Sequence, residues 1–462
     1  MSRSGADALH RPGHGPDDLL ALLRRHARPL TGAADDYDPL VAMLGEARLA
    51  LLGEASYGTH DFYAERVRIT QRLIVEHGYA AVAVEGDWPD AYRVDRYVRG
   101  LPGDADATAA LGGFARFPAW MWRNTVVRDF VEWLRTHNAG LPPEARVGFY
   151  GMDLYSLFSS IAEVLRYLDR TDPAAALRAR ERYACFDRFG EDGLAYGHAA
   201  SRDMGQACED AVVAQLLELA RNAGSSGGAD GSAGDPEPEA RFHAAQNARL
   251  VRNAERYHRA MFRGRIVSWN LRDEHMVETL EALDTHLGLL RGAPPRIAVW
   301  AHNTHLGDAS ATELGDLGEW NVGQLLRERI GRRAVRVGFT TWGGSVTAAS
   351  AWDGPGRTET VRPGLPGSVE DLFHRVGTER FLLVLRDEPA MEEALRAPLL
   401  QRAIGVVYAP RTERRSHYFH ARLPQQFDAV VHLDATRALE PLPPVPGAGG
   451  PAETPEACPS GL

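Results

Sequence analysis

The chain contains no lysine, so arginine supplies all 52 of its permanently cationic side chains. Schiff-base catalysis, a pyridoxal phosphate cofactor and a phosphate-binding loop of the Walker A type all require a lysine. These three classes of enzyme are therefore excluded. The base composition of a genome is enough to explain the absence, but the exclusion holds whatever the cause.

Two other enzyme signatures are missing. No GxSxG motif stands at a predicted turn from strand to helix, which argues against a serine hydrolase. No glycine-rich dinucleotide motif follows the first predicted strand, which argues against a nicotinamide-dependent oxidoreductase.

Cysteine is scarce. Cys185, Cys208 and Cys458 are the only three in 462 residues, and none lies in a CxxC pair or a metal-finger spacing. Few and widely separated cysteines are typical of proteins that remain reduced. The sequence therefore predicts a reduced, cytoplasmic protein, and no motif supports a cysteine nucleophile.

Long apolar runs are also absent, so neither a signal peptide nor a membrane span is expected. The formal net charge of −10 comes from interspersed acids and arginines rather than from blocks of one sign. Without a basic surface, nucleic acid is not an expected partner, and neither is a membrane. The expected partner is a small molecule, and the oligomeric state is not indicated.

Short apolar runs alternate with helical patterns, which is typical of an α/β protein. We predict a central, mostly parallel sheet flanked by helices, within one catalytic domain over residues 17–440. A helical insertion at 156–290, with a mobile linker at 224–238, is expected to cap the carboxyl ends of the strands. Residues 1–16 and 441–462 are expected to form a flexible leader and a disordered tail.

The later part of the chain carries four more apolar runs that predict strands, and the last of them are candidates for antiparallel pairing at an edge. These runs are residues 335–339, 381–385, 403–407 and 429–433.

Acidic residues follow three of the earlier apolar runs: Glu54 after 49–52, Glu85 after 80–84, and Asp153 after 146–150. Open α/β sheets bind ligands at the carboxyl ends of their strands. Arg66 lies within the apolar stripe of the helix expected after the first strand, and a buried guanidinium needs a carboxylate partner. Glu54 or Glu85 is that expected partner; the alternative is that both acids are solvated loop residues.

A fourth strand, 296–300, leads into the sequence AHNTH. The turn signal that follows favours His302 and His305 facing one site together with Glu54 and Glu85. Neutral histidine beside carboxylates is suited to drawing a proton from water. Two histidines and an acid also suit a catalytic zinc site. No cofactor is required by the sequence, and a divalent metal stays an alternative.

An aromatic segment, residues 114–138, contains Trp120 and Trp122. One interpretation is a pocket for a bulky apolar ligand, since Pro118 interrupts the helical pattern beside both rings. The other is an ordinary core stripe. The polar segment SWNLRDEH at 268–275, taken by itself, indicates a solvated helix face.

The chain resembles the erythromycin esterase family from about residue 49 to residue 439. The stretches that carry the resemblance are GEASYGTHDFYAER, AVAVEGDWPDA, FPAWMWRNTVVRDFVEWL, FYGMDLYS, SWNLRDEHM, VWAHNTHLGD and ERRSHYFHARLPQQFDAVVH. The resemblance implies hydrolysis of a cyclic ester by a histidine-activated water. It implies that Glu54 and Glu85 are the key acids, Arg66 the arginine, and His302 and His305 the later histidines. The candidate substrate-binding residues are Trp88, Trp120, Trp122, Asp153 and Arg272.

One position departs from the family pattern. The family has Gly-Glu-x-x-His after its first acid, with that histidine as the favoured base, whereas this sequence has Tyr57. A phenol with a reference pKa near 10 is a poor base at neutral pH. His60 is a candidate replacement, although one helical turn displaces it by roughly 5 Å.

Three hypotheses for function follow from Tyr57. The first is an ester or lactone hydrolase with His302, His305 or His60 as the base. The second is a non-hydrolytic enzyme, catalysing acyl transfer, cyclisation or elimination, in which Tyr57 donates a hydrogen bond or acts as an acid. The third is a non-catalytic protein that binds a small molecule.

Overall fold

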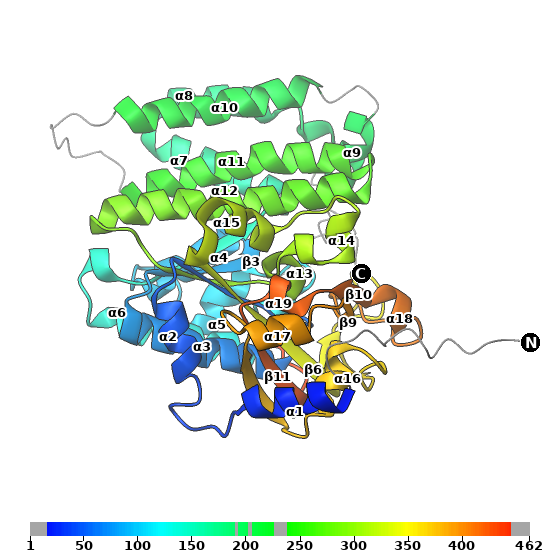
Figure 1. The fold of residues 1–462 in the computed structure, drawn as a ribbon. Helices are drawn as coiled ribbons and strands as arrows, with labels where there is room; N and C mark the ends of the chain where they lie inside the picture. The colour runs from blue at the N-terminus through cyan, green and yellow to red at the C-terminus, as the bar shows by residue number, and fades with distance from the viewer. Residues whose placement is uncertain (1–15, 190–192, 202–205, 226–237, 445–462) are drawn as a thin grey trace, which may run out of the picture.

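A computed structural model of the chain describes residues 16–189, 193–201, 206–225 and 238–444 (Figure 1). The predicted leader lies almost wholly outside these ranges. Most of the predicted linker, 226–237, and most of the predicted tail, 445–462, also lie outside them.

A nine-stranded sheet forms the centre of the described structure, and its middle strands are all parallel. In spatial order the parallel strands are β11 (Ala429–Thr436), β6 (Ala334–Ala348), β2 (Leu49–Leu52), β5 (Ile297–Trp300), β3 (Ala81–Asp87) and β4 (Gly148–Asp153). Antiparallel pairing adds β8 (Arg380–Val384) beyond β11, β1 (Arg28–Pro29) beyond β8, and β7 (Arg357–Val361) on β6. The prediction of a mostly parallel sheet with an antiparallel edge is confirmed.

The register of three adjacent strands places their carboxyl ends level with one another. Leu52 of β2 and Val84 of β3 are both opposite Trp300 of β5. The residues that follow these positions therefore leave the sheet side by side, although they are up to about 250 positions apart in sequence. Glu54, Glu85 and His302 all belong to those segments, so strand pairing alone brings them to one edge.

Two cores, one on each face of the sheet, follow from the alternation of side chains along the buried strands. On one face, Leu52, Val84 and Trp300 pack with helices on that side. These helices are α2 (Asp38–Gly45), α3 (His60–His77), α4 (Trp88–Val98) and α6 (Thr125–Ala139). On the other face, Leu51 and Val299 pack against the helical insertion.

The insertion forms a helical layer over that second face, drawn from cyan to green in Figure 1. Its helices are α7 (Leu157–Thr171), α8 (Pro173–Tyr183), α9 (Gly193–Ala199), α10 (Gln206–Ser225), α11 (Pro238–Met261) and α12 (Arg265–Arg291). The α12 helix lies next to the sheet, and its Met276, Leu280 and Leu283 are buried there. Its first turns reach the carboxyl ends of the strands.

Three local expectations need correction. The apolar run 403–407 is not a strand but an irregular, partly buried segment with isolated bridges, Ser56 to Ile404 and Ala349 to Val407. Its Ala403 and Ile404 are buried in two small cores beside a second sheet of β9 (Leu399–Arg402) and β10 (Tyr418–Ala421). The start of the predicted disordered tail also packs, since Leu442 is buried in the main core.

The third correction concerns the cysteines. Cys185 and Cys208 form a disulfide inside the insertion, so the expectation of a fully reduced chain is wrong for this pair. The residues are 23 positions apart in sequence and come together only because α8 and α10 pack side by side. Cys458 lies outside the described residues.

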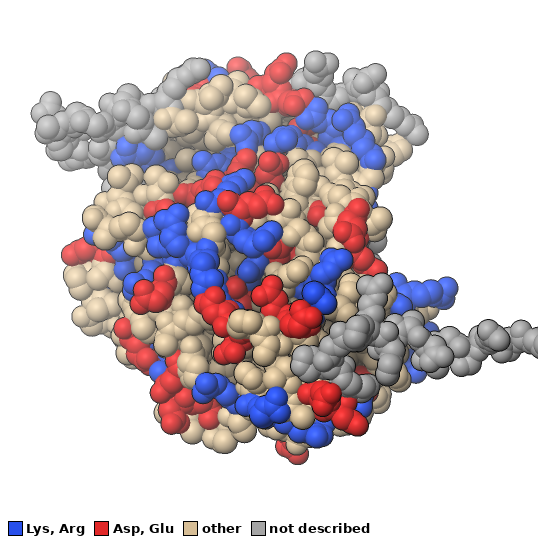
Figure 2. Space-filling model, in the orientation of Figure 1, with Lys and Arg blue, Asp and Glu red and all other residues tan. Residues whose placement is uncertain are grey.

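The surface seen in Figure 2 carries acidic and basic side chains next to one another. Among the described helices, none is both long and apolar enough to cross a membrane.

The buried strands predict a clear difference between core and surface truncations. Phe149→Ala removes a side chain with no exposure from the core beside β4, so we expect a loss of about 3–5 kcal/mol in the free energy of unfolding. Leu289→Ala is the control, because Leu289 on α12 is 81% exposed and should change stability by only about 0.5 kcal/mol. Urea unfolding measures both. Equal losses in the two variants would contradict the assigned core.

Candidate active site

Glu54 and Arg66 form an ion pair with almost no exposure to solvent, as the sequence predicted. Nη1 of Arg66 donates to Oε1 of Glu54 over 3.1 Å, and the two side chains are 0% and 1% exposed. The guanidinium also lies over the ring of Tyr63, at 4.2 Å from its centroid, and at 5.2 Å from that of Trp300. Arg66 is therefore held by one charge and two aromatic faces.

The second carboxylate oxygen of Glu54, Oε2, is buried and has no partner of standard hydrogen-bond geometry among the described residues, although the hydroxyl of Tyr63 acts on this carboxylate and lowers its pKa. Burial raises the pKa of Glu54 to about 7, the charge of Arg66 opposes this rise, and the charge of Glu85 adds to it. At neutral pH this carboxyl group is therefore close to half ionised, which suits it to accept and return a proton.

Glu85 is the most highly connected acid of the site. Its Oε1 accepts from the hydroxyl of Tyr57 at 2.5 Å and from Nη2 of Arg272 at 2.8 Å. Its Oε2 accepts from the backbone N–H of His302 at 2.9 Å. Burial alone would raise the pKa of Glu85, but the charge and hydrogen bond of His305, together with Arg272, hold that pKa below its usual range. Glu85 is therefore ionised.

Arg272 comes from α12 and joins the insertion to the sheet. Its Nε and Nη2 bind the two oxygens of Asp153 at 2.9 and 2.6 Å, a bidentate pair in addition to the bond to Glu85. Its guanidinium carbon lies 4.8 Å from the ring centroid of Tyr155. Both residues were predicted to bind substrate; the structure shows that they bind each other, and the substrate-binding role stays a prediction.

His305 is buried between acids. Its Nδ1 lies 2.9 and 3.0 Å from the oxygens of Asp273, and its Nε2 lies 3.4 Å from Oε1 of Glu85. Burial opposes protonation, but the charges of Asp273 and Glu85 outweigh it and raise the pKa of His305 to about 9. Its Nε2 also approaches Nη1 of Arg272 at 3.1 Å, a contact that would favour a neutral ring. The carboxylates prevail, because the charges of Asp273 and Glu85 together outweigh that of Arg272.

His302, three positions earlier, is in the opposite state. Burial lowers its pKa to about 4, so the ring is neutral. The backbone N–H of Thr304 donates to its Nδ1 at 3.2 Å, at the start of α13 (Asn303–Leu306), so the ring proton is on Nε2. Nε2 is buried and has no partner of standard hydrogen-bond geometry among the described residues, while the backbone of Ala55 acts to raise the pKa of the ring. The ring lies 4.8 Å from that of Tyr57.

The structure thus brings most of the predicted catalytic residues into one buried network, and it leaves one outside. The members are Glu54, Tyr57, Arg66, Glu85, His302 and His305. His60 is the exception: it is only partly buried, and the charged residues that influence its pKa are Arg437, Asp61 and Glu440.

The three predicted substrate-binding tryptophans are core residues. Trp88 is 2% exposed and stacks on Tyr150. Trp122 is 4% exposed and donates its indole N–H to the backbone carbonyl of Glu85 at 3.0 Å, and Trp120 is 6% exposed in the same core. This burial fits the core-stripe interpretation of Trp120 and Trp122, and the predicted role of the three tryptophans in substrate binding stays a prediction.

Sequence reasoning missed two members of the site, Asp273 and Trp269. Trp269 stacks on His305 with centroids 4.5 Å apart and planes within 7°. Trp269, Arg272 and Asp273 stand at i, i+3 and i+4 of α12, the spacing that gives one face of a helix. From this spacing the sequence alone could have indicated that Trp269 and Asp273 lie on the same helix face as Arg272.

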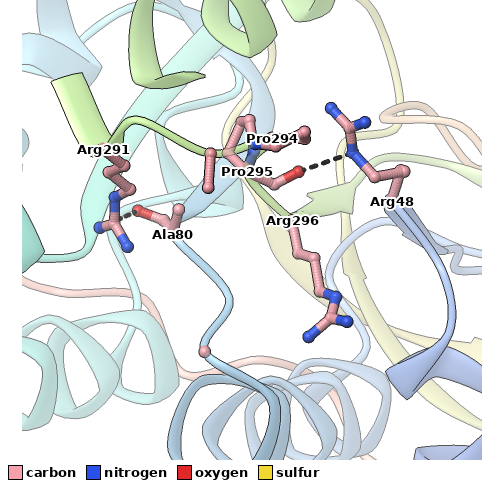
Figure 3. Close-up of a pocket in the computed structure, with 8 residues that line it drawn as sticks. Arg48, Ala80, Arg291, Pro294, Pro295 and Arg296 are labelled. Atoms are coloured by element: carbon pink, nitrogen blue, oxygen red, sulfur yellow. Dashed lines mark hydrogen bonds between the residues drawn. The ribbon is translucent and has the colours of Figure 1, made fainter. Parts of the chain in front are cut away.

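A cavity of about 440 Å³ lies at the opposite end of the sheet (Figure 3). It is lined by residues that precede strands β2, β3 and β5, among them Arg48, Ala80 and Arg296. Its arginines are bound to backbone carbonyls: Arg48 to Pro295 and Arg291 to Ala80, as Figure 3 shows, and Arg296 to His77. None of the site residues above lines this cavity.

Comparison with known families and proteins gives one consistent result. The family described as erythromycin esterase matches residues 74–436, a range that includes Glu85, Arg272, His302 and His305. A Bacillus subtilis protein named "Putative hydrolase YbfO" is 21% identical over 431 residues, which cover 89% of this chain and 90% of that protein.

Solved structures share the fold. A Bacillus cereus protein superimposes with a TM-score of 0.77 at 21% identity, covering 93% of this chain and all of that one. A succinoglycan biosynthesis protein gives 0.73 at 19% identity, over 93% and 99%. A mutant of the erythromycin esterase EreC in its open conformation gives 0.60 at 16% identity, over 87% and 94%.

The raised pKa of His305 predicts a pH-dependent stability. Since the pKa is about 9 in the folded chain and 6.5 in the reference state, the charged ring stabilises the fold fully below pH 6.5, and this contribution is lost as the pH rises through 9. We expect the free energy of unfolding to fall over this range, and to fall less in His305→Gln. Urea unfolding at successive pH values measures the free energy of unfolding, with His60→Gln as the control. Identical pH profiles for wild type and His305→Gln would contradict the assignment.

Proposed function

This chain belongs to the erythromycin esterase family, and we propose that it is a hydrolase that cleaves a carboxylic ester or lactone with a water activated by Glu54. Family membership and the name of its Bacillus subtilis relative support hydrolysis in general. The observation that carries the finer proposal is that two buried polar atoms without a hydrogen-bond partner among the described residues, Oε2 of Glu54 and Nε2 of His302, belong to residues that follow neighbouring strands at one sheet edge.

The protonation states of the other candidates support Glu54 as the base. Tyr57 donates to Glu85, and burial together with the charge of Glu85 raises its pKa well above the usual value, so its phenol stays protonated. His305 is already protonated at neutral pH. His302 is neutral, but with a pKa of about 4 it binds a proton weakly. Glu54, with a pKa of about 7, is matched to the task.

His302 takes a different role in this proposal. With its proton on Nε2, the neutral ring is a hydrogen-bond donor without an acceptor, and donors of this kind stabilise the oxyanion that forms when water attacks a carbonyl. Its place beside Glu54 is fixed by the backbone, because the N–H of Asn303 donates to the carbonyl of Glu54 at 2.8 Å.

The reaction then proceeds in two steps. Oε2 of Glu54 takes a proton from water as the water oxygen forms a bond to the ester carbonyl carbon, and Nε2–H of His302 donates to the resulting oxyanion. The carbonyl re-forms as the bond to the alkoxy oxygen breaks, and Glu54 returns the proton to that oxygen. The products are a carboxylic acid and an alcohol, or one hydroxy acid from a lactone.

A divalent metal at the predicted histidines fits this arrangement poorly. Nε2 of His305 already lies 3.1 Å from Nη1 of Arg272, and its Nδ1 lies 2.9 Å from an oxygen of Asp273, so neither ring nitrogen of this histidine is left for a metal. The proposed reaction therefore uses side chains alone.

The pH dependence of the rate separates Glu54 from His302 as the base. If Glu54 is the base, kcat/KM for a simple aryl ester should rise about tenfold for each pH unit below pH 7 and level off above pH 7. Glu54→Gln should lower kcat by about 10²–10⁴, whereas Glu370→Gln, which changes a buried glutamate elsewhere, should leave it unchanged. A rise centred near pH 4 would assign the base to His302 instead.

Substitutions of Tyr57 test the hypotheses of altered chemistry and of simple binding. If the protein is a hydrolase, wild type cleaves aryl esters or a macrolide lactone, and Tyr57→Phe keeps most of that activity because Glu85 retains Arg272 and His302 as donors. Turnover by HPLC and ligand binding by calorimetry are the measurements. Activity that appears only in Tyr57→His, with ligand binding in wild type, would instead support a non-hydrolytic enzyme or a binding protein.

A further inference from the structure

A second polar cluster lies away from the catalytic network, between α4 and the first turns of α11. Asp95 comes from α4, and Glu239 and His243 are four positions apart on α11, which puts them on one helical face. One ligand atom from each of the three lies within 4.8 Å of the other two.

His243 lacks any hydrogen-bond partner for its ring. It is 3% exposed, and neither Nδ1 nor Nε2 has a partner among the described residues. The ring is held in place by Tyr92, with centroids 3.2 Å apart, and by Trp88 at 4.9 Å. A buried polar group without a partner costs about 1–3 kcal/mol, so a ligand that binds this nitrogen is favoured.

The side chains that face His243 combine two carboxylates with cationic groups. Asp95 is fully buried and Glu239 half-buried, and the guanidinium of Arg99 lies close to both. Nε of Arg99 donates to both oxygens of Asp95, at 2.8 and 2.9 Å, and Nη2 lies 3.6 Å from Oε1 of Glu239. The charge of Arg96 also acts on the ring of His243, so the unpartnered nitrogens of His243, rather than an excess of negative charge, point to a ligand.

Each carboxylate also keeps free lone pairs. Oδ2 of Asp95 accepts one bond, from Arg99. Oε1 of Glu239 accepts from the hydroxyl of Tyr150 at 3.2 Å, and Oε2 lies 2.8 Å from Nε2 of His286. Because a carboxylate oxygen has two lone pairs, all three oxygens can still coordinate a cation, and His286 and Tyr150 orient the ligand as supporting residues do in metal sites.

We propose that Asp95, Glu239 and His243 bind a divalent transition-metal ion, with Zn²⁺ as the best fit to one imidazole and two carboxylates. A tetrahedral zinc centre needs ligand atoms roughly 3.4 Å apart. Binding therefore draws the three side chains together from their present separation and ties the start of α11 to α4. The site is independent of the proposed ester hydrolysis.

Calorimetric titration of EDTA-treated, full-length protein with ZnCl₂ tests the site. We expect one equivalent to bind to wild type and to the control His137→Ala, which removes a half-buried histidine on α6. His243→Ala should lose this binding. Glu239→Gln keeps the shape of a half-buried side chain at the start of a helix, so this variant should fold. We expect it to weaken Zn²⁺ binding at least tenfold. It keeps the test valid even if His243→Ala fails to fold.

Cobalt supplies a second readout. Co²⁺ added to the EDTA-treated protein should give visible absorption bands that persist in His302→Asn, which alters the catalytic network, and disappear in Glu239→Gln. Two results would overturn the proposal: no Zn²⁺ binding by wild type, or unchanged stoichiometry and affinity in both His243→Ala and Glu239→Gln.

Discussion

The carboxylate of Glu85 is the interaction on which the arrangement of the site depends. It accepts hydrogen bonds from a loop hydroxyl, a guanidinium of the helical insertion and a backbone amide after β5, so three distant parts of the chain meet at two oxygen atoms. A buried charge with several donors is stable only while those donors remain, because removing one partner of a buried pair is strongly destabilising. The donors thus specify one relative position for the strand ends and α12.

The site separates chemically identical residues into different protonation states. His305 is charged because acids surround it, whereas His302 is neutral because burial dominates. Glu85 is ionised by its donors, whereas Glu54, with a single arginine and a nearby acid, has a raised pKa. Pairs of titratable groups whose pKa values are pushed apart are the usual way in which one site holds both a proton acceptor and a proton donor.

The convergence of Glu54, Glu85, His302 and Arg66 could be predicted from sequence because it follows from regular features. Parallel strands end at one edge, and an apolar stripe buries whatever lies within it. Asp273 and Trp269 were not predicted, since their roles depend on how α12 is rotated against the sheet, which tertiary packing decides. The sequence left two interpretations of Trp120 and Trp122 open for a related reason: Pro118 does interrupt the helical pattern, but only the tertiary packing shows that both rings are buried in the core.

The disulfide and the segment 403–407 show the same limit. Cysteine spacing along the chain says nothing about two helices that pack side by side, and an apolar run long enough for a strand forms one only if a neighbouring strand has a free edge. Both outcomes were set by contacts between segments far apart in sequence.

The path of α12 has a consequence for how a substrate enters. Between Arg291, which donates to the carbonyl of Ala80 before β3, and Arg272, which lies at the carboxyl ends of the strands, the helix runs about 29 Å by its residue count. The helical layer therefore cannot swing outward as a hinged cover without pulling the guanidinium off Glu85 and Asp153. A bulky molecule can therefore enter without breaking these ion pairs only along a path beside this helix, not underneath it.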